Sequence, residues 1–404
     1  KSVLVNNLGY RESESTWNEA QPGDNLVLTL DLELQKAAER ALAASEAKPR
    51  GAIVVMDVQN GDVLALVSLP AYDPNLFLPR LLEADWQAYL EPRQAPLFNR
   101  ATAGSYLPGS TVKILVGLAA LEAGILDPDK LYHSPGYYQL GKRRIKDEAQ
   151  GGQPASFDFK RALKQSSNAY FVHYGLLTGI DDLVAMGQRF HLGEKTALPL
   201  PRGQESTGIF PTPDWREHRL GGAWHDGDTA NISMGQGYVT ITPIQMAVLV
   251  SAVANGGTVF WPRLVARVEP ADPTRAHEAI DWPASRVRDT LKVSRRNLKL
   301  VRDAMLADVE DADGTGRKAH IEGLPICAKT GTAQMPKRGY MDYITWFASF
   351  APYDAPRYAV VVVVESGVSG GTTCAPIARE VYLAIQELQA RPDAPGRPLA
   401  RNEP

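Results

Sequence analysis

A serine and a lysine three residues apart form the first candidate catalytic pair of this 404-residue sequence. Ser110 and Lys113 stand in segment 107–113 (LPGSTVK), directly before a run of apolar residues. Pro-Gly before a serine is typical of a helix start, and the apolar run predicts a buried helix. The spacing places Lys113 one turn from Ser110 on the same helix face. Burial lowers the pKa of a lysine, so its neutral amine can take a proton from the serine.

A serine and an asparagine form the second candidate motif. Ser166 and Asn168 stand in segment 164–171 (KQSSNAYF), 56 residues after Ser110. Projecting from one loop into a cleft, the Ser166 hydroxyl could relay a proton and the Asn168 side chain could bind a substrate amide. This composition is also typical of ordinary loops, so the pair is weak evidence by itself.

The third candidate motif is a lysine followed by hydroxyl residues and a glycine. Lys329, Thr330, Gly331 and Thr332 lie in a predicted strand at 326–332. Gly331 allows another backbone to approach closely, as happens when an extended peptide pairs with an edge strand. A cation with two hydroxyls suits a carboxylate. Taken singly, the three motifs also fit a helix cap, a loop and a strand end, but all three in this order and with this spacing are hard to produce by accident.

The sequence predicts no metal site and no cofactor. No two of its histidines have the spacing of metal ligands on a helix, and its two cysteines can form at most one disulfide. Segment 311–314 (DADG) lacks most ligands of a calcium loop and is predicted to be a turn. Segment 314–317 (GTGR) lacks the lysine of a phosphate-binding loop. Cys327, two residues before Lys329, is expected to be a small packed residue.

The composition is that of a globular protein without a nucleic-acid partner. Hydrophobic residues make up 44% and charged residues 22%, and 43 basic against 46 acidic residues give a net charge of −3. Nucleic-acid binding usually requires a basic surface. The apolar run at 358–364 is far shorter than a membrane helix of about 20 residues. A leader or an anchor removed from before residue 1 remains an open alternative.

The elements that must position these motifs are strands at both ends of the chain and helices between them. A strand at 25–30 is followed by a helix that Asp31 caps and that ends near residue 46. Two hairpins and one further strand are predicted, while residues 75–320 are mostly helices and loops. This pattern predicts an α+β domain whose sheet is assembled from distant parts of the chain. The hairpin and sheet strands are 52–57 with 62–68, 344–350 with 358–365, and 326–332.

With these residues in view, the chain resembles the class B penicillin-binding proteins, which are monofunctional transpeptidases related to the serine β-lactamases. The resemblance covers about residues 25–388. Within it, residues 73–75 (DPN), 227–229 (GDT) and 375–378 (APIA) are most similar to the members that act in cell elongation, with the division-specific members next. The stretches that carry the class B resemblance are 57–77, 99–113, 234–246 and 345–365.

The resemblance implies a role for each motif residue. Ser110 would be the acylated nucleophile, Lys113 its general base and Ser166 a proton relay. The backbone N–H groups of Ser110 and Thr332 would form an oxyanion hole. The implied catalytic residues are Ser110, Lys113, Ser166 and Lys329, and the implied substrate-binding residues are Asn168, Thr330, Gly331 and Thr332.

The resemblance also implies a fold and a domain organisation. The implied fold is a five-stranded antiparallel sheet flanked by helices, beside an all-helical lobe. Residues 1–24 would be a linker or the remnant of an N-terminal pedestal domain, and residues 25–390 the transpeptidase domain. Residues 391–404, with four prolines and few apolar side chains, are expected to be a disordered tail.

The implied activity is a DD-transpeptidase that cross-links peptidoglycan stem peptides and that β-lactams inhibit. The implied partners are a membrane glycosyltransferase of the shape, elongation, division and sporulation (SEDS) type and a rod-shape scaffold protein. The catalytic domain would lie on the periplasmic side of the bacterial inner membrane. A class A β-lactamase is disfavoured because no Glu-x-x-x-Asn element is found at Glu194 or Glu205. A β-lactam sensor or scaffold without turnover remains an alternative.

Overall fold

The computed structural model describes residues 2–15, 22–45, 49–78, 81–91, 94–337 and 340–391. The chain divides into two compact units. The first contains Lys1–Leu28 and Val265–Pro283, and the second contains Thr29–Leu264 and Ala284–Pro404. All three candidate motifs belong to the second unit.

The first unit is built from short antiparallel strands. Strands β1 (Ser2–Val5) and β2 (Arg11–Ser15) pair with each other. A three-stranded sheet has the order β12-β11-β3 and contains the predicted strand at 25–30, which ends two residues earlier than expected. Its strands are β3 (Asn25–Leu28), β11 (Val265–Glu269) and β12 (Ile280–Asp281).

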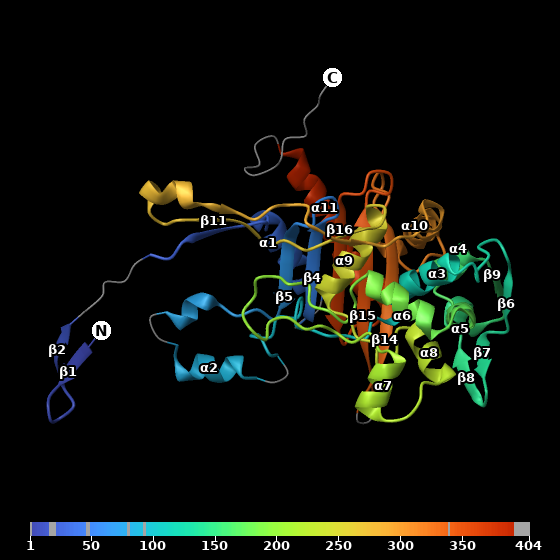
Figure 1. Cartoon of the computed structure of the whole chain (residues 1–404), viewed down its shortest axis with the longest axis horizontal. Helices are drawn as coiled ribbons and strands as arrows, with labels where there is room; N and C mark the ends of the chain where they lie inside the picture. The colour runs from blue at the N-terminus through green and yellow to red at the C-terminus, as the bar shows by residue number, and fades with distance from the viewer. Residues whose placement is uncertain are drawn as a thin grey trace, which may run out of the picture. The chain divides into compact units, whose positions relative to one another are not determined.

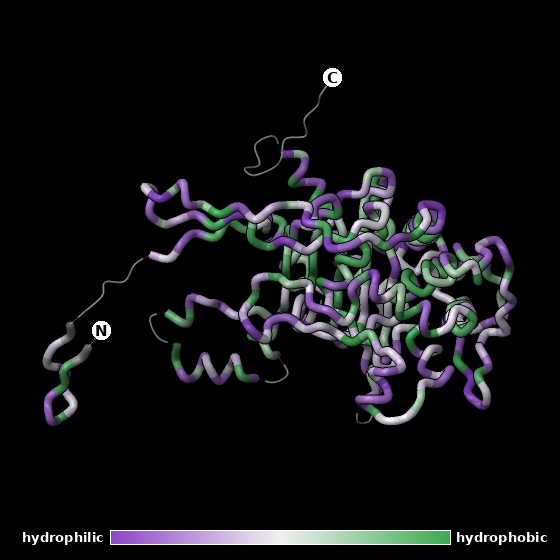
Figure 2. The backbone as a smooth tube through the Cα atoms, viewed as in Figure 1, coloured by the Kyte–Doolittle hydropathy of each residue, from purple (hydrophilic) through white to green (hydrophobic). Residues whose placement is uncertain are grey.

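The second unit is organised around a five-stranded sheet (Figure 1). The strand order is β14-β15-β16-β4-β5, and every neighbouring pair is antiparallel. The predicted five-stranded antiparallel sheet is therefore confirmed. Figure 2 shows that its inner strands are strongly hydrophobic, as the valine run of β16 requires. The strands are β4 (Arg50–Asp57), β5 (Val63–Leu69), β14 (Cys327–Lys337), β15 (Tyr340–Ala351) and β16 (Tyr358–Glu365).

Helices cover both faces of this sheet because alternate residues of the inner strands point to opposite sides. In β4, Ile53 and Val55 pack on one side with α1 (Leu32–Ala43) and α11 (Ala375–Ala390). Val54 and Met56 pack on the other side against buried residues of three further helices. These are α3 (Lys113–Glu122), α9 (Pro243–Ala254) and α10 (Arg295–Glu310).

The first helix of the second unit begins where the sequence predicts. The Asp31 carboxylate accepts hydrogen bonds from the backbone N–H groups of Glu33 and Leu34, both at 3.0 Å. Such a cap satisfies N–H groups that have no partner within the helix.

The part of the chain between the sheet strands is mainly helical, but it is not all-helical. Two short antiparallel ribbons, β6 with β9 and β7 with β8, lie within it, so the expectation of an all-helical lobe is corrected here. Strands of three or four residues are too short to show a clear alternation of polar and apolar side chains. The ribbons are β6 (Tyr132–Ser134), β7 (Tyr137–Leu140), β8 (Arg143–Lys146) and β9 (Ala155–Phe157).

Six further α-helices and one further two-stranded ribbon remain among the described elements. The helices are α2 (Glu83–Tyr89), α4 (Phe159–Lys164), α5 (Asn168–Thr178), α6 (Ile180–Arg189), α7 (Pro213–Leu220) and α8 (Asp226–Ser233). A last ribbon joins β10 (Thr258–Phe260) to β13 (Val287–Thr290).

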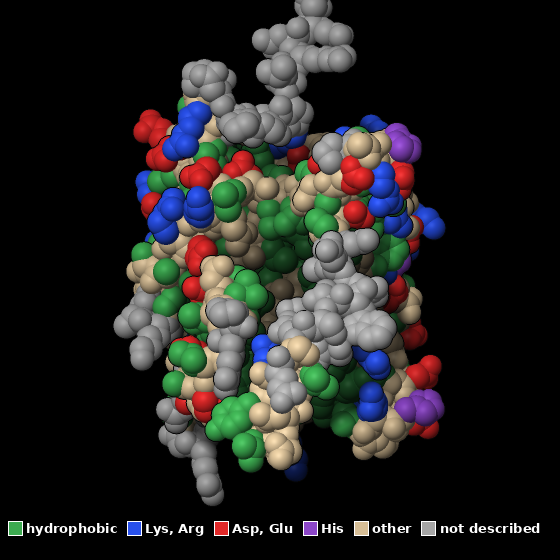
Figure 3. Space-filling view, turned by 90° about the vertical axis from the view of Figure 1, so that its left-hand side faces the viewer, with side chains coloured by type: hydrophobic (Ala, Val, Ile, Leu, Met, Phe, Trp, Pro, Cys, Tyr) green, Lys and Arg blue, Asp and Glu red, His purple; other side chains and the backbone are tan. Residues whose placement is uncertain are grey.

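The helices, the cysteines, the surface charges and the C-terminal residues bear on the remaining predictions. Within the described ranges, the helices are all too short or too polar to span a bilayer. Cys327 and Cys374 are both buried and are not joined in a disulfide, and Cys327 packs in the core as expected. Figure 3 shows acidic and basic side chains interspersed over one face, in keeping with the near-balanced charge. The predicted disordered tail lies, after Arg391, outside the described residues.

Candidate active site

The first motif forms the start of a buried helix. Residues Gly109–Val112 make one 3-10 turn, η2, that continues directly into α3. Ser110 is half-buried in this turn, and Lys113, the first residue of α3, is fully buried. Gly109 has φ = +52°, a conformation that favours glycine, and its N–H donates to the carbonyl of Gly235 at 3.0 Å.

The first and third motifs meet through their backbones. A methyl group on Gly109 would lie 2.9 Å from the carbonyl carbon of Thr332 and 3.0 Å from its nitrogen. A methyl group on Gly331 would lie 2.7 Å from the carbonyl oxygen of Pro108. Contact this close is possible only because both positions lack a side chain. The Lys-Thr-Gly segment thus contacts the serine turn. Since β14 is an edge strand, the same segment also has an outer backbone edge that can pair with a peptide.

The first and second motifs meet through the buried lysine. The Lys113 Nζ donates to the carbonyl oxygen of Ser166 and to Oδ1 of Asn168, each at 2.8 Å, and lies 3.3 Å from Oγ of Ser166. Ser166 has φ = +60° in the loop between α4 and α5, an unusual conformation for a residue with a side chain. Ser167 caps α5 and leaves Ser166 and Asn168 half-buried beside the amine.

The Lys113 amine is hydrogen-bonded to the second motif and not to Ser110, which the spacing had placed beside it. An ammonium group has three protons, and the second motif offers an acceptor for each of them. Within the described part of the chain, the Ser110 hydroxyl takes part in no hydrogen bond, so it is not held by Lys113 in this state. Hydrogen bonds between catalytic groups often tighten only when substrate is bound.

Burial strongly perturbs the amine of Lys113. The loss of hydration is the largest cause and holds the pKa of Lys113 well below its usual value of 10.5. The positive charge of Lys329 lowers it further, while the carboxylates of Asp147 and Glu148 oppose the shift. The unprotonated amine is thus far more accessible here than on a surface lysine.

The third motif places a second buried lysine next to two threonines. Lys329 donates from Nζ to the carbonyl oxygen of Thr330 at 3.1 Å, and its pKa is lowered by burial and raised by the charge of Asp308. The Thr330 hydroxyl lies 2.5 Å from that of Thr315, and Oγ1 of Thr332 accepts the N–H of Gly370 at 3.2 Å. A cation with two hydroxyls is thereby gathered at one point of the edge strand.

One residue that supports the second motif was missed by the sequence analysis. The buried carboxylate of Asp147 accepts hydrogen bonds from the Ser167 hydroxyl at 2.7 Å, the Asn168 N–H at 2.8 Å and the Ser134 hydroxyl at 3.0 Å. These three bonds fix the loop that carries Ser166. A single aspartate in the segment 146–150 (KDEAQ) gives no recognisable signal in the sequence.

A turn that was expected to be ordinary connects the second and third motifs. The Lys164 ammonium donates to Asp311 at 2.8 Å and to Asp313 at 2.7 Å, and Thr315 from the same turn reaches Thr330. Segment 311–314 is therefore a turn, as predicted, whose carboxylates hold the end of α4. Only the long-range contact explains this composition, and long-range contacts cannot be read from one sequence.

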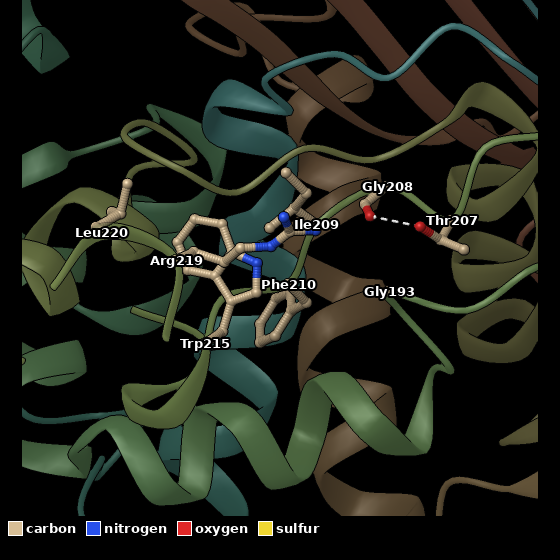
Figure 4. A pocket seen from close by; sticks show the side chains of 8 residues that line it. All are labelled: Gly193, Thr207, Gly208, Ile209, Phe210, Trp215, Arg219 and Leu220. Atoms are coloured by element: carbon tan, nitrogen blue, oxygen red, sulfur yellow. Dashed lines mark hydrogen bonds between the residues drawn. The ribbon is translucent and has the colours of Figure 1, made fainter. Parts of the chain in front are cut away.

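A pocket of about 490 Å³ lies between α7 and the segments that contain Gly193 and Gly208. Figure 4 shows the Trp215 and Arg219 side chains of α7 meeting Ile209 and Phe210 there. Ile209 bridges to Thr240, and the Trp215 ring packs on Tyr238 at 5.6 Å. Two lining residues therefore contact positions 238 and 240, a few residues after Gly235, whose carbonyl supports the serine turn. Its lining is Gly193, Thr207, Gly208, Ile209, Phe210, Trp215, Arg219 and Leu220.

The sequence of the chain matches known proteins. Residues 51–383 match the family described as the penicillin binding protein transpeptidase domain. The peptidoglycan D,D-transpeptidase MrdA of Haemophilus influenzae is 32% identical over 406 residues, which cover 96% of this chain and 60% of that protein. This chain thus spans about 60% of the length of that curated relative.

Solved structures agree in fold. The PBP2 of Pseudomonas aeruginosa, solved with the compound WCK 5153, has a TM-score of 0.77 and 35% identity, covering 90% of this chain and 76% of that one. The PBP2 of Helicobacter pylori, solved in complex with MreC, has a TM-score of 0.79 and 28% identity, covering 96% and 68%. The resemblance inferred from the motifs is confirmed, and the chain belongs to the penicillin-binding protein transpeptidase family, among its class B, PBP2-like members.

Proposed function

We propose that this chain is the catalytic part of a peptidoglycan DD-transpeptidase. The observation that carries the proposal is the buried Lys113 amine, hydrogen-bonded to Ser166 and Asn168 at the base of the turn that presents Ser110. The Ser110 hydroxyl attacks the carbonyl of the penultimate D-Ala of a donor stem peptide. The terminal D-Ala leaves with a proton, and an amine from a neighbouring stem peptide then resolves the ester to form the cross-link.

The two buried lysines divide the proton transfer and the substrate recognition between them. Lys113, with its lowered pKa, is the base for the Ser110 proton, and the Ser166 hydroxyl at 3.3 Å returns a proton to the leaving amine. Lys329, with Thr330 and Thr332, binds the carboxylate of the donor peptide. β-Lactams carry a similar carboxylate and would acylate the same serine.

The close backbone contact of the first and third motifs supports an oxyanion hole. The N–H groups of Ser110 and Thr332 belong to the turn and the edge strand that meet at Gly109. Removal of one such donor typically costs about 3–4 kcal/mol of transition-state stabilisation. Gly331 keeps the edge of β14 close to the turn, and Asn168 positions the peptide through its amide.

The biological role that we propose is cell elongation, as the relatives named MrdA and PBP2 suggest. The MreC complex of the H. pylori relative supports a rod-shape scaffold as one partner, and a SEDS-type glycosyltransferase is the other. We place the domain at residues 25–390, on the periplasmic side of the inner membrane, after a pedestal remnant at 1–24. Division is the alternative role.

The test is a transpeptidation assay with the purified chain. A donor peptide ending in D-Ala-D-Ala and a labelled amine acceptor are expected to give free D-Ala and a new labelled amide. Penicillin should block both products, and Ser110→Ala should form neither. A wild-type protein that binds penicillin covalently but forms no product from any stem peptide would instead be a sensor or scaffold without turnover.

A further inference from the structure

We propose that Asp308 and Thr315 are positioning residues of the carboxylate-binding site, where they orient Thr330 and keep Lys329 positively charged. The inference rests on the proposed function, since it concerns how the donor carboxylate is recognised. Neither residue belongs to the three motifs, and both act through residues that do.

The first part of the argument is a chain of hydrogen bonds. Asp308 lies on α10 and is fully buried, and its Oδ1 accepts the Thr315 N–H at 2.9 Å and the Thr315 hydroxyl at 2.5 Å. The Thr315 oxygen lies 2.5 Å from the Thr330 hydroxyl. A threonine hydroxyl has a single proton. Because Thr315 gives that proton to the carboxylate, it is the acceptor toward Thr330. The single Thr330 proton is then used on Thr315, and the Thr330 oxygen is held 3.5 Å from the Nζ of Lys329, so the chain of hydrogen bonds positions Lys329.

The second part is the charge balance around Lys329. The lysine is 0% exposed, so its positive charge has lost its hydration. Lys113 on α3 is near enough for the charge of Lys329 to lower its pKa, and Lys164 from α4 is paired with Asp311 and Asp313. Asp308 from α10 is the negative group that raises the pKa of Lys329. The opposite residues of β15, Phe347 to Ser349, carry no charge.

The third part is the state of the carboxylate itself. Burial is the largest influence on Asp308 and raises its pKa, while the charge of Lys329, the N–H and hydroxyl donors of Thr315 and the N–H of Gly316 lower it. Its Oδ2 is buried and has no hydrogen-bond partner among the described residues. A half-satisfied buried carboxylate is costly in a core whose only task is stability. Because only the Thr315 hydroxyl separates this carboxylate from Thr330, we infer that the carboxylate is kept for its effect on the carboxylate-binding site.

The test compares Asp308→Asn and Thr315→Val by their rates of acylation with a fluorescent penicillin across a pH series. Asp308→Asn should acylate ~10-fold more slowly near neutral pH, as expected for the loss of a charged hydrogen-bond partner. Activity needs protonated Lys329, and the loss of the Asp308 charge should lower the pKa of Lys329. The alkaline limb of the pH profile of Asp308→Asn should therefore move to lower pH. Thr315→Val should slow acylation and leave that limb in place, and Thr315→Ser, which keeps the hydroxyl, should restore the rate.

A second probe separates positioning from a general structural defect. With a penicillin whose carboxylate is methylated, Asp308→Asn and wild type should react at similar rates. The matched control is Asp303→Asn on the same helix, which pairs with Lys299 and should change neither measurement. The proposal is overturned if Asp308→Asn loses the same factor in rate with both penicillins, or if the alkaline limb of its pH profile does not move. If Asp308→Asn does not fold, the proposal is overturned when Thr315→Val and wild type react at equal rates. A wild type that takes up no penicillin refutes the proposed function instead.

Discussion

Replacement of Lys113 by methionine is expected to slow acylation by penicillin by ~10²–10⁴-fold, the usual contribution of a general base. Methionine preserves the volume of the buried side chain but cannot accept a proton. It also leaves the Ser166 carbonyl and the Asn168 amide oxygen without their 2.8 Å donor, which costs stability by about 1–3 kcal/mol. The rate is measured with a fluorescent penicillin, and the thermal unfolding of the variant shows whether it is folded.

Lys113→Arg distinguishes a base from a positive charge. Arginine keeps the charge but cannot lose its proton in a protein, so this variant should be as slow as Lys113→Met. The wild-type rate should rise as the pH rises through the lowered pKa of Lys113, because the neutral amine is the reactive form. Both variants should lose this rise. A fast Lys113→Arg would assign Lys113 an electrostatic role only.

Gly109→Ala is expected to slow acylation by ~10²-fold, because small displacements of catalytic groups have effects of this size. The new methyl group would lie 2.9–3.0 Å from three backbone atoms of Thr332 and must push the edge strand away from the serine turn. The displacement separates the two N–H groups of the proposed oxyanion hole. The measurement is again the rate of acylation.

The chain offers a matched control for the backbone strain. Gly141 has φ = +54°, almost the value of +52° at Gly109, but a methyl group there would meet no atom within 4 Å. Gly141→Ala should therefore show a similar loss of stability, about 1 kcal/mol, with an unchanged acylation rate. If Gly109→Ala reacts as fast as Gly141→Ala, the contact with Thr332 does not position the reacting groups.

Elements with strong local patterns were predictable from the sequence. The valine run of β16 and the hairpin of β4 and β5 are apolar enough to identify the sheet, and Asp31 identifies the start of α1. The end of β14 was not predictable. Its last residues, up to Lys337, are held by pairing with β15 rather than by their own alternation.

The site was only partly predictable, because its supporting contacts connect distant residues. The spacing of Ser110 and Lys113 follows from one helix, and the expected burial of the lysine agrees with the structure. Its orientation toward Ser166 depends on the unusual backbone of a loop 53 residues away. Asp147 and Asp308 act through three-dimensional contacts, and no local pattern marks either of them.

The most direct test of the account is to find which atom penicillin acylates. After the purified chain reacts with penicillin, mass spectrometry of its peptides should show one adduct, on the peptide that contains Ser110, and Ser110→Ala should carry none. An adduct on another residue, or undiminished labelling of Ser110→Ala, would contradict the claim that the three motifs form one acylation site around this serine.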